Sequence, residues 1–216
     1  MAVLSIILGY VLGSIPFAYL IARRARNCDI REVGYGNAGT LNVAHEMGWL
    51  LGSVVLVGDA GKGALSTWIA RRFGLADWMI LLTGLAAMLG HNFPLFLGFR
   101  GGKGLATGLG VLLTLMPGEM FVALLVLALF YLVISRNIAF SAIVSMIFLS
   151  RLAAWRELVA PLVIAPWAVL MTMGTRALPQ AWRTWVNSTD KRDLILHEFL
   201  FPHRGREPRD DANEEV

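Results

Sequence analysis

Long apolar runs dominate the chain and are separated by short polar stretches. Runs of spanning or near-spanning length fall at residues 3–22, 50–71, 76–97, 105–117, 119–135, 138–154 and 157–174. A helix needs about 20 mostly apolar residues to cross the hydrocarbon core of a bilayer. The pattern therefore predicts an all-α, polytopic membrane protein with about seven transmembrane helices, in which residues 1–175 form a single domain.

Three local signals refine this picture. The first run lacks a basic leader and is followed directly by Arg23 and Arg24, which is typical of an uncleaved transmembrane helix rather than a signal peptide. Pro117 and Gly118 predict a tight turn between the fourth and fifth runs. Residues 176–216 are expected to form a cytoplasmic tail, with an amphipathic piece at 194–201 and disorder toward the end.

The distribution of charge predicts the orientation in the membrane. The chain is 56% hydrophobic and only 16% charged, with a formal net charge of +4. If the N-terminus lies outside, the segments 23–48, 98–104, around 136 and from 175 onward hold 14 of the 19 Lys and Arg residues. Cytoplasmic loops carry the excess of such residues, so we expect an N-out, C-in topology. The positive charge is then explained without nucleic acid, and Cys28, the single cysteine, predicts neither a disulfide nor a cysteine metal cluster.

Two glycine-rich stretches fall on this predicted cytoplasmic side. The second, "LFLGFRGGKGLATGLG" at 95–110, contains Arg100 and Lys103, and a helix is expected to begin at about Leu105. The first, "DIREVGYGNAGTLNVAHEMG" at 29–48, contains Asn37, with Arg31 just upstream. Glycine-rich backbone can form a hollow of N–H groups that binds anions, and a helix N-terminus beyond it adds to the attraction. The alternative is that these glycines only let helices pack closely.

Further polar residues lie within or beside the apolar runs. Asp59 and Lys62 are three residues apart on one helix face, which predicts either a mutual ion pair or a functional site. His91 is either a hydrogen-bonded packing residue or a catalytic one, and His45 is a side chain able to titrate near neutral pH. A third polar cluster consists of Ser135, Arg136, Asn137 and Ser141. Phosphate-binding groups at the inner face of a membrane suit a substrate with a phosphorylated end and an acyl chain.

Five pieces of sequence, taken in order, resemble the bacterial acyl-phosphate:glycerol-3-phosphate acyltransferase family. They are "GSIPFAYLIA" (13–22), "DIREVGYGNAGTLNVAHEMG" (29–48), "DAGKGALSTW" (59–68), "GHNFPLFLGFRGGKGLATGLG" (90–110) and "SRNIAFSAI" (135–143). The resemblance implies a seven-helix enzyme of the bacterial inner membrane whose active site faces the cytoplasm. It also implies transfer of a fatty acyl group from acyl phosphate to glycerol 3-phosphate, giving lysophosphatidic acid and phosphate, the first step of phospholipid synthesis.

The residue patterns and the resemblance together give the expected site; the resemblance implies the roles of Gly101, Gly102, Lys103, Gly104, Asn37 and Ser141. We expect catalytic roles for Lys103, Asn37 and His45, and no metal or other cofactor. Substrate or phosphate binding is expected from Gly34, Gly36, Gly39, Asn42, Arg31, Arg100, Gly101, Gly102, Gly104, Ser141, His91 and Lys62. The expected partners are acyl phosphate, glycerol 3-phosphate, the lipid bilayer and the enzyme that makes acyl phosphate.

The chain departs from the family pattern at several positions of the first stretch. Tyr35 stands where the family has serine, Thr40 and Leu41 replace Ala-Thr, and His45 replaces arginine. No match to the C-terminal family motif is found at 174–193. Two alternatives therefore stay open at this point: a membrane transporter of small phosphorylated anions, and an inactive relative of the acyltransferases.

Overall fold

The computed structural model describes residues 1–187, and within them every regular element is a helix. The apolar runs become helices because a helix satisfies its own backbone hydrogen bonds where no water is available. The α-helices are α1 (Ala2–Gly13), α2 (Phe17–Arg26), α3 (Thr40–Met47), α4 (Trp49–Arg72), α5 (Asp77–Asn92), α6 (Leu105–Leu115), α7 (Pro117–Phe130), α8 (Ile138–Trp155) and α9 (Ala160–Asn187). A 3₁₀ turn, η1 (Leu95–Leu97), and a π turn, η2 (Tyr131–Ser135), complete the described chain.

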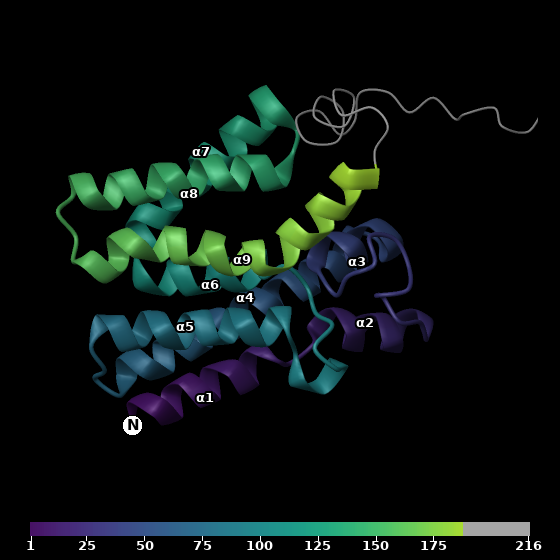
Figure 1. Cartoon of the computed structure of the whole chain (residues 1–216), viewed down its shortest axis with the longest axis horizontal. Coiled ribbons are helices and arrows are strands. Elements are labelled where there is room, and N and C mark those ends of the chain that lie inside the picture. The colour runs from purple at the N-terminus through teal and green to yellow at the C-terminus, as the bar shows by residue number, and fades with distance from the viewer. Residues whose placement is uncertain (188–216) are drawn as a thin grey trace, which may run out of the picture.

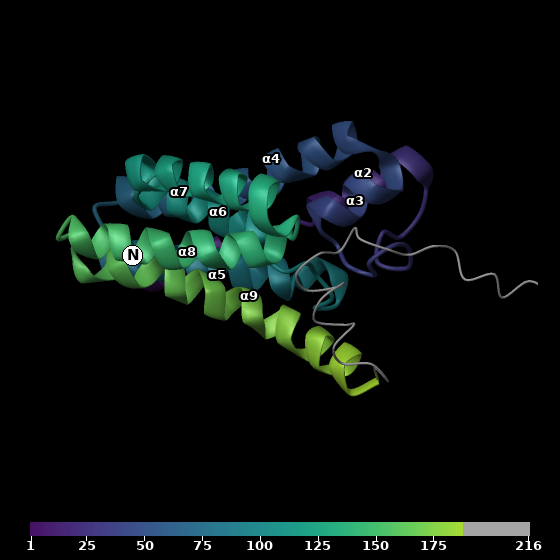
Figure 2. The same cartoon turned by 90° about the horizontal axis from the view of Figure 1, so that it is seen from above.

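The long helices run side by side, and the short elements gather at one end of the bundle (Figure 1). This loop end carries α2, α3, the connection between α5 and α6, and the connection between α7 and α8, as the second view also shows (Figure 2). The turns that join α4 to α5 and α8 to α9 lie at the opposite end. The two glycine-rich stretches therefore lie at the same end of the molecule.

Five helical segments of the described chain are long and apolar enough to cross a membrane: 2–26, 77–97, 117–135, 138–155 and 160–179. The predicted run at 50–71 forms the continuous helix α4, but α4 carries buried polar groups and is not among the five. The predicted run at 105–117 forms the short, mostly buried helix α6. The all-α class is confirmed, whereas the count of seven spans stays a prediction.

Two details of the predicted layout were wrong. The first run is not one helix, because it breaks after Gly13 and resumes as α2 at Phe17, beyond Pro16. Pro117 does not form a turn but opens α7, where its missing N–H and fixed φ are tolerated. The boundary expected at 175–176 falls inside α9, which continues to Asn187. The piece at 194–201 and the rest of the expected tail lie outside the described residues.

The outer faces of the bundle expose large apolar side chains, while small residues bring the inner helices together. Exposed examples include Phe121, Leu129 and Met171, as expected of surfaces that contact lipid. Helices α4 and α6 pack closely through Gly63 and Gly110. A β-carbon at Gly63 would lie 2.2 Å from the Thr107 carbonyl oxygen, and one at Gly110 would lie 1.9 Å from that of Ala60. This packing fixes α6, and with it the loop that leads into α6.

Gly61 and Gly63 provide a matched test of this packing, since both lie in α4. We expect Gly63→Ala to cost about 1–3 kcal/mol, because the added methyl group has no room against α6. Gly61→Ala meets no atom within 4 Å, so it should leave stability unchanged or raise it by about 1 kcal/mol. Thermal unfolding in detergent measures both. Equal midpoints for the two variants would contradict the close α4–α6 contact.

Candidate functional site

The second glycine loop, defined here as residues 98–104, connects η1 to α6. Its backbone turns through positive φ at Gly98 (59°), Phe99 (62°) and Gly104 (80°). Helix α6 then begins at Leu105, where the sequence predicted a helix start. The loop folds back on the end of α5, because the N–H of Gly101 donates to the Asn92 carbonyl oxygen and that of Gly102 to the His91 carbonyl oxygen, both at 3.2 Å.

These two hydrogen bonds change the expected roles of Gly101 and Gly102. The sequence predicted that their N–H groups bind phosphate. In the structure these N–H groups donate to the protein instead, so they are not free to bind phosphate. Both positions lack room for a side chain instead: a β-carbon at Gly101 would lie 2.0 Å from the His91 carbonyl oxygen, and one at Gly102 would lie 2.2 Å from His91 Nε2. The next amides, of Lys103, Gly104 and Leu105, make no hydrogen bond within the described residues. The free N–H groups therefore lie at the N-terminus of α6.

The first glycine loop, defined here as residues 27–39, is shaped by Asn42. The fully buried Asn42 amide donates to the carbonyl oxygens of Ile30, Val33 and Asn37 at 2.8–3.1 Å, and its oxygen accepts the Tyr35 N–H at 2.8 Å. Its polar atoms are thus used inside the protein, so the structure gives Asn42 a place in the loop scaffold. Gly34 and Gly36 adopt positive φ within this loop, and α3 begins just after Gly39.

The two glycine loops are in contact. A β-carbon at Gly102 would lie 2.7 Å from the Ala38 carbonyl oxygen, and Arg31 Nη1 donates to the Leu97 carbonyl oxygen at 2.9 Å. The N-terminus of α3 follows the first loop, and its Thr40 hydroxyl is buried without a hydrogen-bond partner among the described residues. Two helix N-termini, each with unpaired backbone N–H groups, therefore lie on either side of this contact.

The cationic side chains near the two loops differ in their charged partners. Lys103 is exposed and has no acidic partner in the part of the chain that the structure describes, while the surrounding protein desolvates its ammonium and lowers its pKa below the ordinary value. Arg31 pairs with Asp29, and this partner raises the pKa of Arg31 and lowers that of the Asp29 carboxyl. Arg100 is exposed at the surface. Lys103 is thus the cation best placed to gain from an incoming anion.

The remaining predicted residues lie at different depths. Asn37 is half-buried, and its amide donates to the Tyr35 carbonyl oxygen at 3.3 Å. His45 is exposed, contacts the Tyr35 ring at 5.2 Å between centroids and pairs with Glu46. Ser141 is buried in the first turn of α8, where its hydroxyl donates to the Asn137 carbonyl oxygen. No hydrogen bond within the described residues joins Ser141 to either glycine loop.

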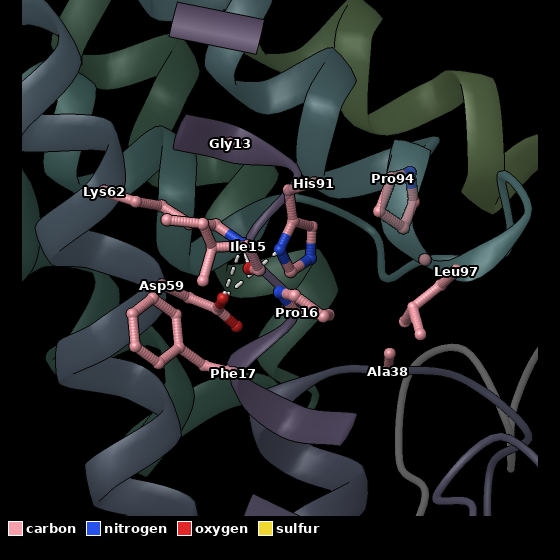
Figure 3. A pocket seen from close by; sticks show the side chains of 11 residues that line it. Gly13, Ile15, Pro16, Phe17, Ala38, Asp59, Lys62, His91, Pro94 and Leu97 are labelled. Carbon is pink, nitrogen blue, oxygen red and sulfur yellow. Dashed lines mark hydrogen bonds and ion pairs between the residues drawn. The ribbon is translucent and has the colours of Figure 1, made fainter. Parts of the chain in front are cut away.

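A buried ionic cluster lies beside the glycine loops (Figure 3). Lys62 Nζ is 2.8 Å from Asp59 Oδ1, which confirms the predicted ion pair, and His91 Nδ1 is 3.4 Å from the same oxygen. Lys62 Nζ also donates to the Ile15 carbonyl oxygen at 2.8 Å. The three side chains border a cavity of about 10 Å³ that Gly101 and Ala38 also line. Lys62 is therefore engaged inside the protein, and its expected contact with substrate is not supported by this arrangement.

Comparison with known proteins places this chain in a family. The family model described as glycerol-3-phosphate acyltransferase matches residues 3–186. The chain belongs to the glycerol-3-phosphate acyltransferase family. Glycerol-3-phosphate acyltransferase 1 of Dehalococcoides mccartyi is 35% identical over 210 residues, which cover 93% of this chain and 99% of the relative. A glycerol-3-phosphate acyltransferase from Thermus thermophilus is 49% identical over 116 residues, which span 54% of this chain and 58% of the relative.

Two crystal structures of PlsY, an integral membrane glycerol 3-phosphate acyltransferase, share the fold. The glycerol 3-phosphate form has a TM-score of 0.76 at 30% identity and covers 92% of this chain and 98% of its own. The lysophosphatidic acid form has a TM-score of 0.73 at 30% identity, over 86% and 92% of the two chains. This member of the glycerol-3-phosphate acyltransferase family is therefore a multi-pass membrane protein.

Two residues at the site of this family member had no role predicted from the sequence. Arg176 of α9 donates to the Gly101 carbonyl oxygen at 3.3 Å and lies over the Phe93 ring, 5.5 Å from its centroid. Asn92 at the end of α5 donates to the Thr172 carbonyl oxygen at 2.8 Å. The Arg176 contact ties α9 to the second glycine loop, and the Asn92 contact ties α9 to the end of α5, against which that loop folds. A single Arg at the end of an apolar run was the available signal, but nothing in the sequence indicated its partner.

The scaffold role of Asn42 is testable by hydrogen exchange. We expect Asn42→Ala to speed amide exchange across residues 27–39 by about tenfold or more, because the four hydrogen bonds of the Asn42 side chain, one buried and three partly buried, are lost. Asn37→Ala serves as the control, since it removes one half-exposed bond and should change exchange in this segment little. Mass-spectrometric hydrogen exchange on detergent-purified protein measures both. Unchanged exchange in Asn42→Ala would contradict the assignment.

Proposed function

We propose that this protein transfers a fatty acyl group from acyl phosphate to glycerol 3-phosphate, giving lysophosphatidic acid and inorganic phosphate. Membership in the glycerol-3-phosphate acyltransferase family supports the acceptor and the product class. The observation that carries the proposal is the contact between the two glycine loops, which lead into the N-termini of α3 and α6, beside the unpaired cation of Lys103. This arrangement suits a reaction between two anionic, phosphate-bearing substrates.

The chemistry follows from the donor. An acyl phosphate is a mixed anhydride and is already activated, so the protein has only to orient the two substrates and offset the repulsion between their charges. The acceptor hydroxyl attacks the acyl carbonyl, a new ester C–O bond forms, and the bond from the carbonyl carbon to the phosphate oxygen breaks. The hydroxyl proton passes to a phosphate oxygen of the substrate, and phosphate leaves.

Different residues of the described chain have different roles in this reaction. Lys103 provides a positive charge at the exposed end of the second loop, just before α6. The amides of Lys103, Gly104 and Leu105 provide N–H donors. On the other side, Asn37 and the start of α3 contribute polar groups, with Arg31 nearby. His45 is exposed beside Tyr35 and offers a further cation when it is protonated. This proposal needs no covalent acyl-enzyme intermediate.

We further propose that the loop end faces the cytoplasm of the bacterial inner membrane, with the N-terminus outside. The excess of Lys and Arg in the segments at the loop end supports this orientation. Both substrates are charged at one end, so a site at the inner face admits them from the cytoplasm while the acyl chain stays in lipid. The enzyme that makes acyl phosphate is then a partner of the same compartment.

One assay tests the proposed activity. Purified protein is incubated with palmitoyl phosphate and glycerol 3-phosphate, and lysophosphatidic acid is measured by mass spectrometry. We expect lysophosphatidic acid and phosphate to form in equal amounts. No product with the protein intact, together with uptake of unchanged phosphate esters into liposomes that contain it, would favour a transporter instead. No product and no uptake would favour an inactive relative.

Under this proposal, substitution of Lys103 should lower kcat/KM more than substitution of any other residue. We expect Lys103→Ala to lower kcat/KM about 10²–10³-fold, since one charged contact to the reacting phosphate is lost. Unfolding temperature should be unchanged, because Lys103 is exposed and unpaired. The control is Arg24→Ala, which removes an exposed cation of α2. Wild-type kinetics in folded Lys103→Ala protein would remove the proposed mechanism.

A further inference from the structure

The buried cluster of Asp59, Lys62 and His91 connects structural elements that are far apart in the sequence. The three residues are only 1%, 4% and 6% exposed. Burying ionisable groups at membrane depth is costly, and a simple apolar contact would hold helices together at less cost. Such a cluster therefore calls for a specific role beyond packing.

Both ends of the cluster reach backbone at helix interruptions. At one end Lys62 donates to the Ile15 carbonyl oxygen, in the break between α1 and α2. At the other end the His91 carbonyl oxygen accepts the Gly102 N–H, and the His91 ring forms the wall beside Gly102. Gly102 directly precedes Lys103. Asp59 stands between the two ends and contacts both Lys62 and His91 (Figure 3).

Asp59 also determines the orientation of the His91 ring. The Asp59 carboxylate lies next to Nδ1, so it favours the tautomer with a proton on Nδ1 and keeps the ring plane fixed. The other ring nitrogen, Nε2, faces Gly102. Because a β-carbon at Gly102 would already be 2.2 Å from Nε2, the loop follows the ring closely. A tilt of the ring displaces the backbone just before Lys103.

We propose that Asp59 is a positioning residue, which acts through His91 to hold Gly102, and hence Lys103 and the amides at the start of α6, in place. This inference extends the proposed function, and its kinetic test depends on the proposed acyltransferase activity. The rival role is a purely structural ion pair that stabilises the packing of α4 against α1 and α5. The two roles differ in what they require at position 59: a hydrogen-bond acceptor for His91, or only a partner for Lys62.

Two double variants separate these roles. Removing Asp59 alone would leave the Lys62 ammonium buried without a counter-ion, which is strongly destabilising. Asp59→Asn/Lys62→Met removes both charges but keeps an acceptor oxygen facing His91 Nδ1. Asp59→Leu/Lys62→Met removes the same charges and keeps a side chain that branches at Cγ, but offers His91 no acceptor. Both lose the Lys62 bond to Ile15 equally, so only the acceptor at position 59 distinguishes them.

The expected result is rescue by the asparagine. We expect the Leu variant to have a kcat/KM about 30- to 100-fold below that of the Asn variant, as for a reacting group displaced by up to ~1 Å. Amide exchange of residues 98–104 should also be at least fivefold faster in the Leu variant. Unfolding temperatures should differ little between the two. If the Leu variant fails to fold, Asp59→Val/Lys62→Met replaces it, since Val also lacks an acceptor.

Equal kcat/KM values for the two double variants would overturn the inference. If the wild-type protein makes no lysophosphatidic acid, the proposed function fails, and the exchange measurement decides the inference alone. In that case, equal exchange of residues 98–104 in the two variants would overturn it. Faster exchange in the Leu variant would support it.

Discussion

The structure depends on one constraint: backbone polar groups exposed where helices break must find partners inside the protein. Three such breaks meet at the loop end. Lys62 satisfies the Ile15 carbonyl between α1 and α2, the end of α5 accepts the N–H groups of Gly101 and Gly102, and Asn42 satisfies the carbonyls of the first glycine loop. Broken helices are tolerated within a membrane protein only where such partners exist or where the loop lines a wet cavity.

This constraint also determines which groups stay available for a ligand. Once the N–H groups of Gly101 and Gly102 have partners, unpaired donors remain at the starts of α3 and α6. Lys103 lies among them, in surroundings that lower its pKa. The glycines thus serve two purposes at once. Gly101 and Gly102 let the loop approach the end of α5, and Gly104 supplies the positive φ from which α6 begins.

The sequence predicted those features that depend on local chemistry. The start of α6 at Leu105, the ion pair of Asp59 with Lys62 and the grouping of both glycine stretches at one end follow from spacing and charge. Our prediction missed the break after Gly13, because the apolar run is continuous there. Pro16 was the local signal of this break. The contacts of Arg176 and the inward bonds of Gly101 and Gly102 depend on tertiary packing, so no local pattern could indicate them.

The two glycine loops are proposed to bind the phosphate of the substrate between the starts of α3 and α6. The most direct measurement of this is a structure of the protein with glycerol 3-phosphate bound. It should place the phosphate within hydrogen-bond distance of Lys103 Nζ and of an amide at residues 103–105. A phosphate bound at the opposite end of the bundle, near the ion pair of Glu119 at the start of α7 with Arg156 after α8, would contradict the proposal.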